Sequence, residues 1–229
     1  TQYAPITPEQ VEKEAEGAFT YRELSEFFQE QNLSIKKVIH DPGRMYLNTY
    51  YADFDEGLYV AVLLDKEFLQ NTVLFLSELN QRQRETFLAE KDWRSFYTIS
   101  VPLALQIYDF QHRYRDIEPD KVFDVWLSIY KRIDYANGQW SSEVLDYVFS
   151  PAPKIKELPE LSESGKITIY RGMGVLSQSP EKAISWSTHP GNALYFANHF
   201  ARGTAFVKGE IAVEDVIAYQ SSFWNENEV

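Results

Sequence analysis

Cysteine is absent from the 229 residues of this chain. Its absence excludes disulfide bonds, thiolate catalysis and cysteine-based metal sites. It fits the reducing cytosol, and it fits equally a protein that crosses a membrane unfolded and needs no oxidative folding. Long apolar runs are also missing, since none approaches the roughly 18 residues that span a bilayer, and the N-terminus lacks the basic-then-apolar pattern of a signal peptide. We therefore expect a cytoplasmic protein without a membrane partner, which could also be delivered into a host or target cell.

Basic residues are scarce relative to acidic ones. The chain has 22 Lys and Arg against 34 Asp and Glu, which gives a net charge of −12. Such a surface disfavours long-range attraction to duplex nucleic acid or anionic membranes and mildly favours basic partners, such as arginine-bearing proteins. Hydrophobic residues make up 44% and aromatic residues 15% of the chain, so we expect folded domains with workable cores rather than disorder.

Helix and strand signals alternate in the N-terminal part. The stretch from Thr7 to Gln10 has a capping threonine, a first-turn proline and a closing glutamine, and the stretch from Thr20 to Glu23 repeats that logic. These patterns predict two short helices within residues 8–31. Aromatic and β-branched residues predict a strand over residues 45–54. The apolar run 58–64 fits either the hairpin partner of that strand or the start of a buried helix.

Helical patterns dominate the middle of the chain. Residues 66–97 and 101–114 are amphipathic, and Pro119 opens the clearest helix, whose apolar residues recur at helical spacing. Ser141 caps a shorter helix that follows. The charged stretch 154–166 is the best candidate for a linker.

Short strands characterise the rest of the sequence. The predicted strands are 168–171, 183–187, 205–211, 216–219 and 226–229, with one helix over 192–200. A mostly β part thus follows a mostly α part, so the fold class is α+β.

Three of these strands carry the residue types of a glycosidic-bond enzyme. On a strand, residues i and i+2 point to the same face, so Glu226 lies beside Glu228 and Ser185 beside Ser187. Neighbouring carboxylates repel each other, which is costly for a scaffold and useful where a cation must be held. Cleavage of a nicotinamide glycosidic bond creates an oxocarbenium-like cation of this kind. The guanidinium of Arg171 can grip two oxygens at once and suits a pyrophosphate.

Together, in this order, the arginine, serine and glutamate strands resemble the signature of the ADP-ribosyltransferases related to cholera toxin. The resemblance covers roughly the last third of the chain. It implies an enzyme that cleaves NAD+, its co-substrate, and transfers ADP-ribose to an acceptor. It also implies an α+β fold in which helices lead into two facing sheets that clasp NAD+. We therefore expect a mostly helical accessory region over residues 1–95 and the ADP-ribosyltransferase domain over residues 96–229.

The resemblance implies a role for each catalytic residue. Arg171 contacts the phosphates and nicotinamide ribose of NAD+, and Ser185 orients the catalytic glutamate. Glu228 binds the ribose 2′-hydroxyl and stabilises the transition state. Glu226 engages the guanidinium of the acceptor, so the expected partner is a target protein that carries the acceptor arginine.

The resemblance also implies binding residues around these four. The loop 219–225 presents the target, with Phe223 and Trp224 as contacts beside Glu226. Phe196 fits the core of a helix face, and as an aromatic ring it could also stack on nicotinamide. No metal is expected, because the nearby histidines have no carboxylate at ligand spacing. The implied cofactor-binding set is Arg171, Gly172, Ser185, Trp186, Ser187, Phe196 and Glu228.

Two features depart from the family pattern. Trp186 stands between the two serines where the family commonly has threonine, so the middle position is not diagnostic. The sequence stops at Val229, whereas the catalytic strand of the family usually continues with several apolar residues. Either the chain is trimmed or this strand is unusually short, and we expect trimming.

Other functions remain open from the sequence. The acceptor could be the amino group of a nucleobase, although the net charge does not favour nucleic acid. Water could replace the acceptor, which would make the protein an NAD+ glycohydrolase. An inactive copy could use its aromatic N-terminal half to bind proteins. By association with bacterial or phage toxins and effectors, residues 1–95 could guide the target or bind a neutralising antitoxin or immunity partner.

Overall fold

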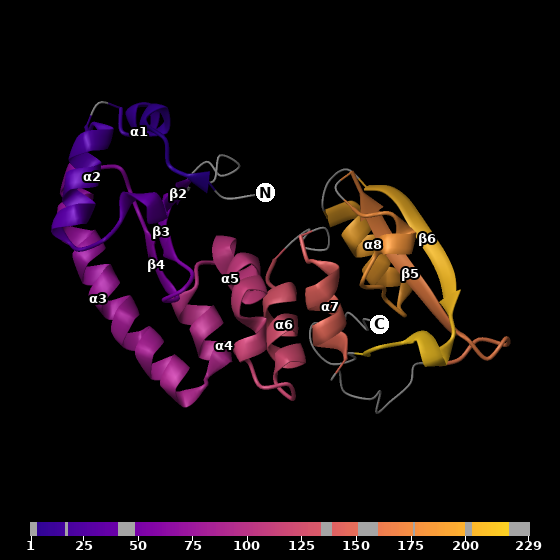
Figure 1. The fold of residues 1–229 in the computed structure, drawn as a ribbon. Helices are drawn as coiled ribbons and strands as arrows, with labels where there is room; N and C mark the ends of the chain where they lie inside the picture. The colour runs from indigo at the N-terminus through magenta and orange to yellow at the C-terminus, as the bar shows by residue number, and fades with distance from the viewer. Residues whose placement is uncertain are drawn as a thin grey trace. The chain divides into compact units, whose positions relative to one another are not determined.

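The chain divides into two compact units, Thr1–Ile117 and Glu118–Val229. The computed structural model describes residues 4–16, 18–40, 49–133, 139–150, 160–175, 177–199 and 203–219. Helices and antiparallel strands occur in both units (Figure 1), so the fold is mixed α+β as the sequence predicted. The division falls after Ile117, whereas the predicted boundary of the transferase domain lies at residue 95, and that functional boundary stays a prediction.

The first unit begins with two capped helices, α1 (Pro8–Glu14) and α2 (Tyr21–Glu30). The hydroxyl of Thr7 accepts from the Gln10 amide at 3.3 Å, and the Gln10 side chain accepts from the Thr7 amide at 2.8 Å. Thr20 and Glu23 form the same reciprocal pair. Both predicted capping boxes are therefore confirmed, because each uses only contacts local in sequence.

A four-stranded antiparallel sheet follows in the order β1-β2-β3-β4. Its strands are β1 (Ala4–Pro5), β2 (Val38–His40), β3 (Thr49–Asp53) and β4 (Leu58–Ala61). The run 58–64 is thus the hairpin partner of the preceding strand, one of its two predicted alternatives. Strands β1 and β2 were not predicted, because they are too short to show a period.

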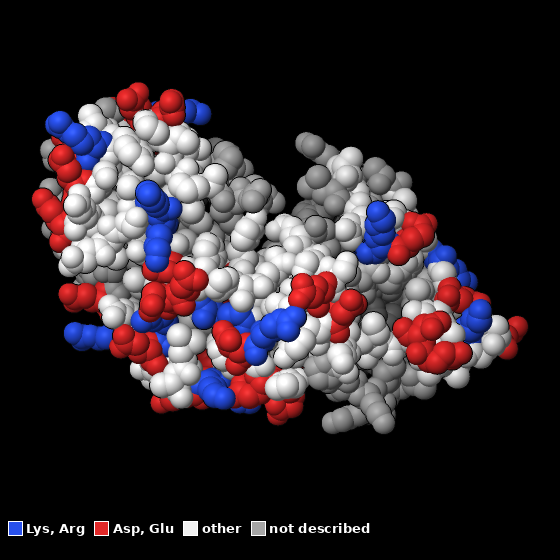
Figure 2. Space-filling view, viewed as in Figure 1, with Lys and Arg blue, Asp and Glu red and all other residues white. Residues whose placement is uncertain are grey.

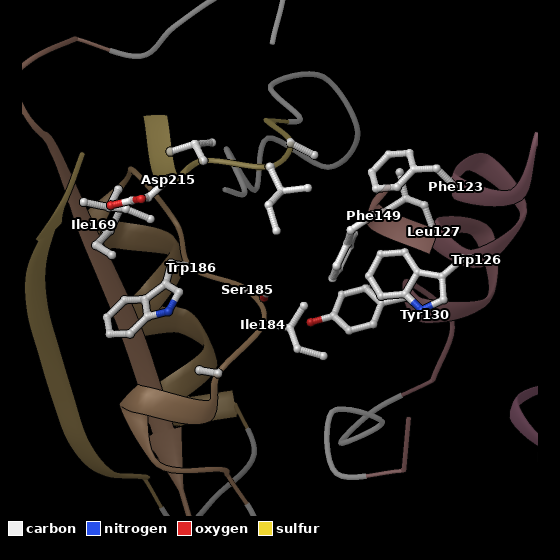
Figure 3. Close-up of a pocket in the computed structure, with 15 residues that line it drawn as sticks. Phe123, Trp126, Leu127, Tyr130, Phe149, Ile169, Ile184, Ser185, Trp186 and Asp215 are labelled. Carbon is white, nitrogen blue, oxygen red and sulfur yellow. The ribbon is translucent and has the colours of Figure 1, made fainter. Parts of the chain in front are cut away.

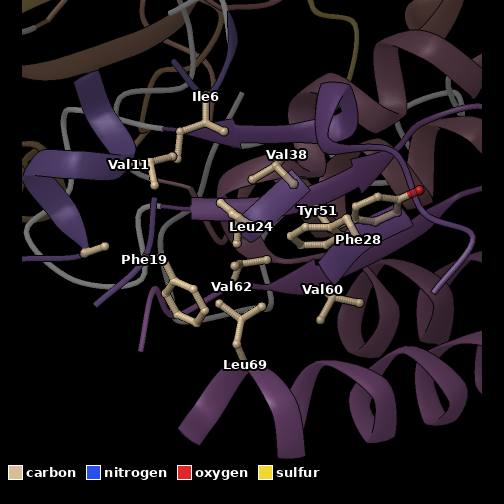
Figure 4. Close-up of a cluster of buried hydrophobic side chains, with 11 residues drawn as sticks. Ile6, Val11, Phe19, Leu24, Phe28, Val38, Tyr51, Val60, Val62 and Leu69 are labelled. Carbon is tan, nitrogen blue, oxygen red and sulfur yellow. The ribbon is translucent and has the colours of Figure 1, made fainter. Parts of the chain in front are cut away.

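The core of the first unit lies between this sheet and its helices (Figure 4). Leu24 and Phe28 of α2 are fully buried, and the Phe28 ring stacks on Tyr51 of β3 at 5.8 Å. The long helix α3 (Lys66–Glu90) packs against β4, and Leu69 from its first turns is also fully buried. Leu24 and Phe28 of α2 and Leu69 of α3 therefore belong to one core cluster with residues of the hairpin.

The first unit ends in short helical pieces: α4 (Trp93–Ser95), a π-helical turn (Phe96–Ser100) and α5 (Gln106–Arg113). The sequence predicted one helix over 101–114, but the structure begins it later. Val101 is extended because the proline ring of Pro102 disfavours the helical region for the residue before it, and a 3₁₀ turn follows.

A buried polar cluster joins α5 to the hairpin. Asp109 is fully buried and accepts hydrogen bonds from the Tyr59 hydroxyl and from Arg113 Nε, the latter at 2.8 Å. Arg113 Nη2 also donates to the backbone carbonyl of Phe54. Burial raises the pKa of Tyr59 above its ordinary value, and the neighbouring Asp109 adds to the shift. Burial also raises the pKa of Tyr97.

The second unit places two helices before a two-stranded sheet. The helices are α6 (Val122–Tyr130) and α7 (Ser142–Phe149), the latter capped by Ser141 as predicted. The strands β5 (Ile167–Gly174) and β6 (Gly203–Ile211) pair antiparallel, which confirms the strands predicted at 168–171 and 205–211. Helix α8 (Pro190–His199) connects them and packs on both.

Two further strand predictions have different outcomes. The segment 183–187 pairs with β5 through a single bridge between Tyr170 and Ser187. Residues 216–219 form no strand, because the chain leaves β6 through a 3₁₀ turn at Val213–Asp215 and no described strand pairs with the residues after it. The strand predicted at 226–229 lies outside the described residues. The described part of this unit thus contains one sheet, and the facing second sheet stays a prediction.

The backbone of α8 lies directly on β5 at Gly172. A β-carbon at this position would overlap the carbonyl oxygen of Ala193 and lie 2.5 Å from the Ala197 nitrogen. Both alanines are buried on the helix face that meets the strand. Any side chain at Gly172 would therefore push the helix away from the sheet.

We expect Gly172→Ala to destabilise the second unit by roughly 3 kcal/mol, because the clash is with backbone atoms that cannot rotate away. Amide hydrogen exchange in α8, measured at increasing denaturant concentration, would give the decrease in the unfolding free energy of the second unit. Gly209→Ala is the matched control, since its β-carbon would lie 3.6 Å from Ile169 Cγ1, an ordinary contact. Equal stability of the two variants would contradict the close approach.

The buried tyrosines predict that the first unit loses stability in alkali. Their pKa values are raised on folding, so above pH ~10 the unfolded chain releases protons that the folded chain retains. The stabilising contribution is present below the ordinary tyrosine pKa and declines as pH rises. We expect Tyr59→Phe to make this decline shallower, by up to about 1.4 kcal/mol per pH unit. Urea unfolding at pH values from about 9 to 11, around the ordinary tyrosine pKa, measures this slope of the unfolding free energy against pH. Tyr195→Phe, which removes an exposed tyrosine, should leave the slope unchanged.

Candidate functional site

The structure brings Arg171 and Ser185 into direct contact. Arg171 lies on β5, and its Nη1 donates a hydrogen bond to the backbone carbonyl of Ser185, 14 residues later in the chain. The bridge between Tyr170 and Ser187, with N–O distances of 2.7 and 2.9 Å, fixes the register of the two segments. The arginine and serine elements of the sequence motif therefore converge, and the link is between a guanidinium and a main-chain oxygen.

Successive side chains of β5 point to opposite faces of the strand, so the contact of Arg171 with Ser185 lies on a different face from the packing of α8. Gly172 faces α8, so Tyr170 shares that face, and its ring stacks on Phe206 of β6 at 5.7 Å. Ile169 and Arg171 belong to the opposite face. Ile169 is buried and lines a cavity there. The strand thus uses one face for the helix and offers the other to a site.

The two serines of the motif have different surroundings. The hydroxyl of Ser187 accepts from the His189 amide at 3.1 Å and from Asn192 Nδ2 at 3.4 Å. It also donates to the His189 carbonyl. Ser187 therefore stabilises the turn that starts α8, a structural role for a residue that the resemblance places at the cofactor. Ser185 instead lines the cavity, beside Trp186.

This cavity has a volume of about 300 Å³ and lies within the second unit (Figure 3). One wall comes from α6 and α7, and the segment 183–186 forms part of the opposite wall, with residues of β5, β6 and the stretch after β6 closing the rest. Asp215 is the charged residue of its lining. The aromatic side chains of the lining are Phe123, Trp126, Tyr130, Phe149 and Trp186.

Trp126 is at the centre of the aromatic wall. Its indole stacks on Tyr130 at a centroid distance of 4.9 Å and meets Phe149 edge-on at 5.2 Å. It is 3% exposed, and among the described residues its Nε1 has no hydrogen-bond partner. The sequence predicted only a buried helix face here. The signal for a cavity was the concentration of aromatic residues on α6, together with the tryptophan between the two motif serines.

Four described residues of the predicted cofactor set are not part of this cavity's lining: Arg171, Ser187, Gly172 and Phe196. The last two also have other packing partners. Gly172 contacts the backbone of α8, as described above, so the structure gives it a packing role. Phe196 is half-buried on α8, where its ring meets Tyr195 edge-on at 5.6 Å. Neither is part of the cavity lining, and a contact of either with a cofactor stays a prediction.

The acidic and target-binding residues cannot be placed. Glu226 and Glu228, as well as Phe223 and Trp224, lie outside the described residues. Their approach to Arg171 and Ser185 stays a prediction. Within the described part of the chain, no group of three His, Asp or Glu side chains could hold a metal ion, and no helix there is long and apolar enough to cross a membrane.

Charged side chains are mixed on the visible surface. In Figure 2, acidic and basic residues intersperse with uncharged ones over the described part of each unit on this face. On this face the acidic residues are thus distributed rather than gathered over one element.

Comparisons with known proteins leave the family of this chain open. No protein-family model, no curated protein and no solved structure matches it. The geometry of Arg171, Ser185 and the adjoining cavity is therefore the structural basis for any functional assignment.

Proposed function

We propose that the protein is a mono-ADP-ribosyltransferase, which cleaves NAD+ and transfers ADP-ribose to an arginine of a target protein. The observation that carries the proposal is the hydrogen bond from Arg171 to the Ser185 carbonyl. It joins two of the three motif elements on the face of β5 that α8 leaves open. A guanidinium held by a backbone oxygen has a fixed orientation, which favours paired hydrogen bonds to the phosphates of NAD+.

In this proposal the reaction breaks the bond between the nicotinamide nitrogen and ribose C1′. Nicotinamide leaves with the bonding electron pair, and positive charge develops on the ribose. The carboxylate of Glu228 stabilises that charge, with Ser185 orienting it. A guanidinium nitrogen of the acceptor then bonds to C1′ and releases its proton, for which Glu226 is the proposed base.

The proposed fold is the two-sheet core of the cholera-toxin-like enzymes. Strand β5, its partner β6, and the segment 183–187 on the other edge of β5 support the first sheet. Helix α8 follows the serine segment, as in the order of motifs that the sequence predicted. The proposal adds the second sheet, with the strand of Glu228, from the part of the chain outside the described residues.

We expect labelled NAD+ to transfer its ADP-ribose to protein in a suitable lysate, with the label removed by hydroxylamine. Glu228→Gln should abolish both transfer and NAD+ hydrolysis, because no carboxylate would stabilise the ribose cation. Glu226→Gln should lose transfer and retain hydrolysis, because it affects only the acceptor. Glu214→Gln, at an exposed glutamate outside the proposed site, is the control for lost charge. Absence of label on any macromolecule would refute the transferase.

The same reactions separate the alternative functions. Label that is sensitive to RNase or DNase and resistant to protease would identify a nucleobase acceptor. Release of nicotinamide without label, unaffected by Glu226→Gln, would identify a glycohydrolase. If saturating NAD+ failed to raise the melting temperature, the protein would be an inactive binding copy, since a ligand at 100 times its Kd should stabilise by about 2.7 kcal/mol.

We expect Arg171→Lys to weaken NAD+ binding at least about tenfold, because an ammonium cannot make the paired contact of a guanidinium. Calorimetric titration of NAD+ gives the Kd directly. The control is Arg132→Lys, at an exposed arginine beyond the end of α6 and outside the cavity lining. Unchanged NAD+ affinity in the Arg171 variant would show that this arginine does not hold the phosphates.

A further inference from the structure

Strand β6 has an outer edge, the edge that faces away from β5. Among the strands that the structure describes, β6 pairs with β5 alone, and the two form a two-stranded sheet (Figure 1). The exposed side chains of β6 include Phe206, Lys208 and Glu210. The edge of a sheet presents a row of N–H and C=O groups that can pair with another strand. The outer edge of β6 is therefore a candidate surface for strand addition.

The register of β5 determines which backbone groups lie at this outer edge. The N–H and C=O of Tyr170 both bond to Ser187, at 2.7 and 2.9 Å, so they point away from β6. Tyr170 lies opposite Lys208, and two opposed residues of an antiparallel pair either bond to each other or both point away. Lys208 therefore directs its N–H and C=O to the outer edge. Because this direction alternates along a strand, Phe206 and Glu210 do the same.

The sheet of the first unit, by contrast, has protected edge strands. Asn80 of α3 donates a hydrogen bond to the Tyr59 carbonyl of β4 at 2.9 Å, and α3 packs along that strand. At the other edge, β1 is two residues long and ends in Pro5, which has no N–H to donate. Within the described part of the chain, no residue makes a comparable contact with the outer edge of β6. This edge is therefore open to a strand from another molecule.

The sequence of β6 is complementary to itself in one antiparallel register. When two copies pair around Gly209, Lys208 lies opposite Glu210 of the partner subunit, and the converse pair forms on the other side of the centre. The backbone groups of both residues point to the outer edge, so each pair can form two main-chain hydrogen bonds. In the same register, Val207 lies opposite Ile211 of the partner subunit. Opposite charges and apolar side chains both stabilise cross-strand pairs.

Charge selects this register over its neighbours. A centre at Lys208 or at Glu210 would place two like charges directly opposite each other, which is destabilising. A lysine alone would protect the edge by that repulsion, whereas the glutamate two residues later makes one register attractive. Ser164 donates to Oε2 of Glu210 at 3.3 Å, and the other carboxylate oxygen can accept from a lysine.

We propose that two copies of the chain associate through the outer edges of β6, in the antiparallel register centred on Gly209. The two sheets join into one of four strands, in the order β5-β6-β6-β5. Opposed side chains of paired strands share a face, so Arg171 of both subunits lies on one side of the joined sheet and α8 of both covers the other. The association does not depend on the proposed transferase activity.

Sedimentation velocity of the full chain tests the association. The chain has a mass of 26.7 kDa. We expect a species of twice that mass to form as the concentration rises to about 500 µM, because an edge pairing is smaller than a standard interface and binds weakly. Lys208→Glu and Glu210→Lys each place like charges opposite at two positions, so each should raise the dimer Kd at least about tenfold. Lys182→Glu, at an exposed lysine outside β6, is the matched control.

Exchange of the charges tests the register. The double variant Lys208→Glu/Glu210→Lys restores both pairs in reversed order and should dimerise as the unchanged chain does. An equal mixture of the two single variants should form a heterodimer, because one copy then presents two carboxylates and the other two ammonium groups. Circular dichroism and thermal unfolding show whether each variant is folded.

Amide hydrogen exchange locates the contact. The outward amides of Phe206, Lys208 and Glu210 should gain protection as the concentration rises. The amides that point to β5, such as those of Val207 and Gly209, should be protected at every concentration.

Four outcomes would overturn the proposal. The first is a chain that stays monomeric at about 500 µM, the upper end of a weak interface. The second is a set of Lys208 and Glu210 variants that dimerise as tightly as Lys182→Glu. The third is a mixture of the single variants that forms no heterodimer. The fourth is protection of the outward amides in the dilute monomer, which would show that the chain itself covers this edge.

Discussion

The contact of α8 with the backbone of β5 is the constraint on which the second unit depends. Because Gly172 has no side chain, the helix lies directly on the strand and covers one of its faces. Because successive side chains on a strand point to opposite faces, the neighbouring residue Arg171 points to the other face. Arg171 therefore lies opposite the helix, where its guanidinium reaches the Ser185 carbonyl, while the adjacent Gly172 has room for no side chain.

The turn before α8 extends the same constraint to the serine segment. Ser187 pairs with Tyr170 through the backbone and holds the turn at His189 through its hydroxyl. The position of this segment along β5 is thereby fixed, and Ser185, two residues earlier, reaches Arg171 through its carbonyl. A serine with a structural role thus positions the serine of the candidate site.

Local contacts made part of the fold predictable from the sequence. The capping boxes at Thr7 and Thr20 involve residues three apart, and the pattern alone predicted them. The hairpin at 58–64 could not be separated from a helix, because a short apolar run has no distinguishing period. The pairing of Tyr59 with Asp109 spans 50 residues, and nothing in either neighbourhood indicates it. Contacts between distant segments are decided by packing, which a single sequence does not encode in any local pattern.

The candidate site divides in the same way. The resemblance to the arginine, serine and glutamate motif predicted that Arg171 and Ser185 belong together, and the structure brings them into contact. The spacing did not predict that the link would run through a carbonyl, which frees the Ser185 side chain to line the cavity. Apolar periodicity on α6 predicted a buried face, and the same periodicity describes the wall of a ring-sized cavity. Trp126 belongs to both, since it is 3% exposed and also lines the cavity.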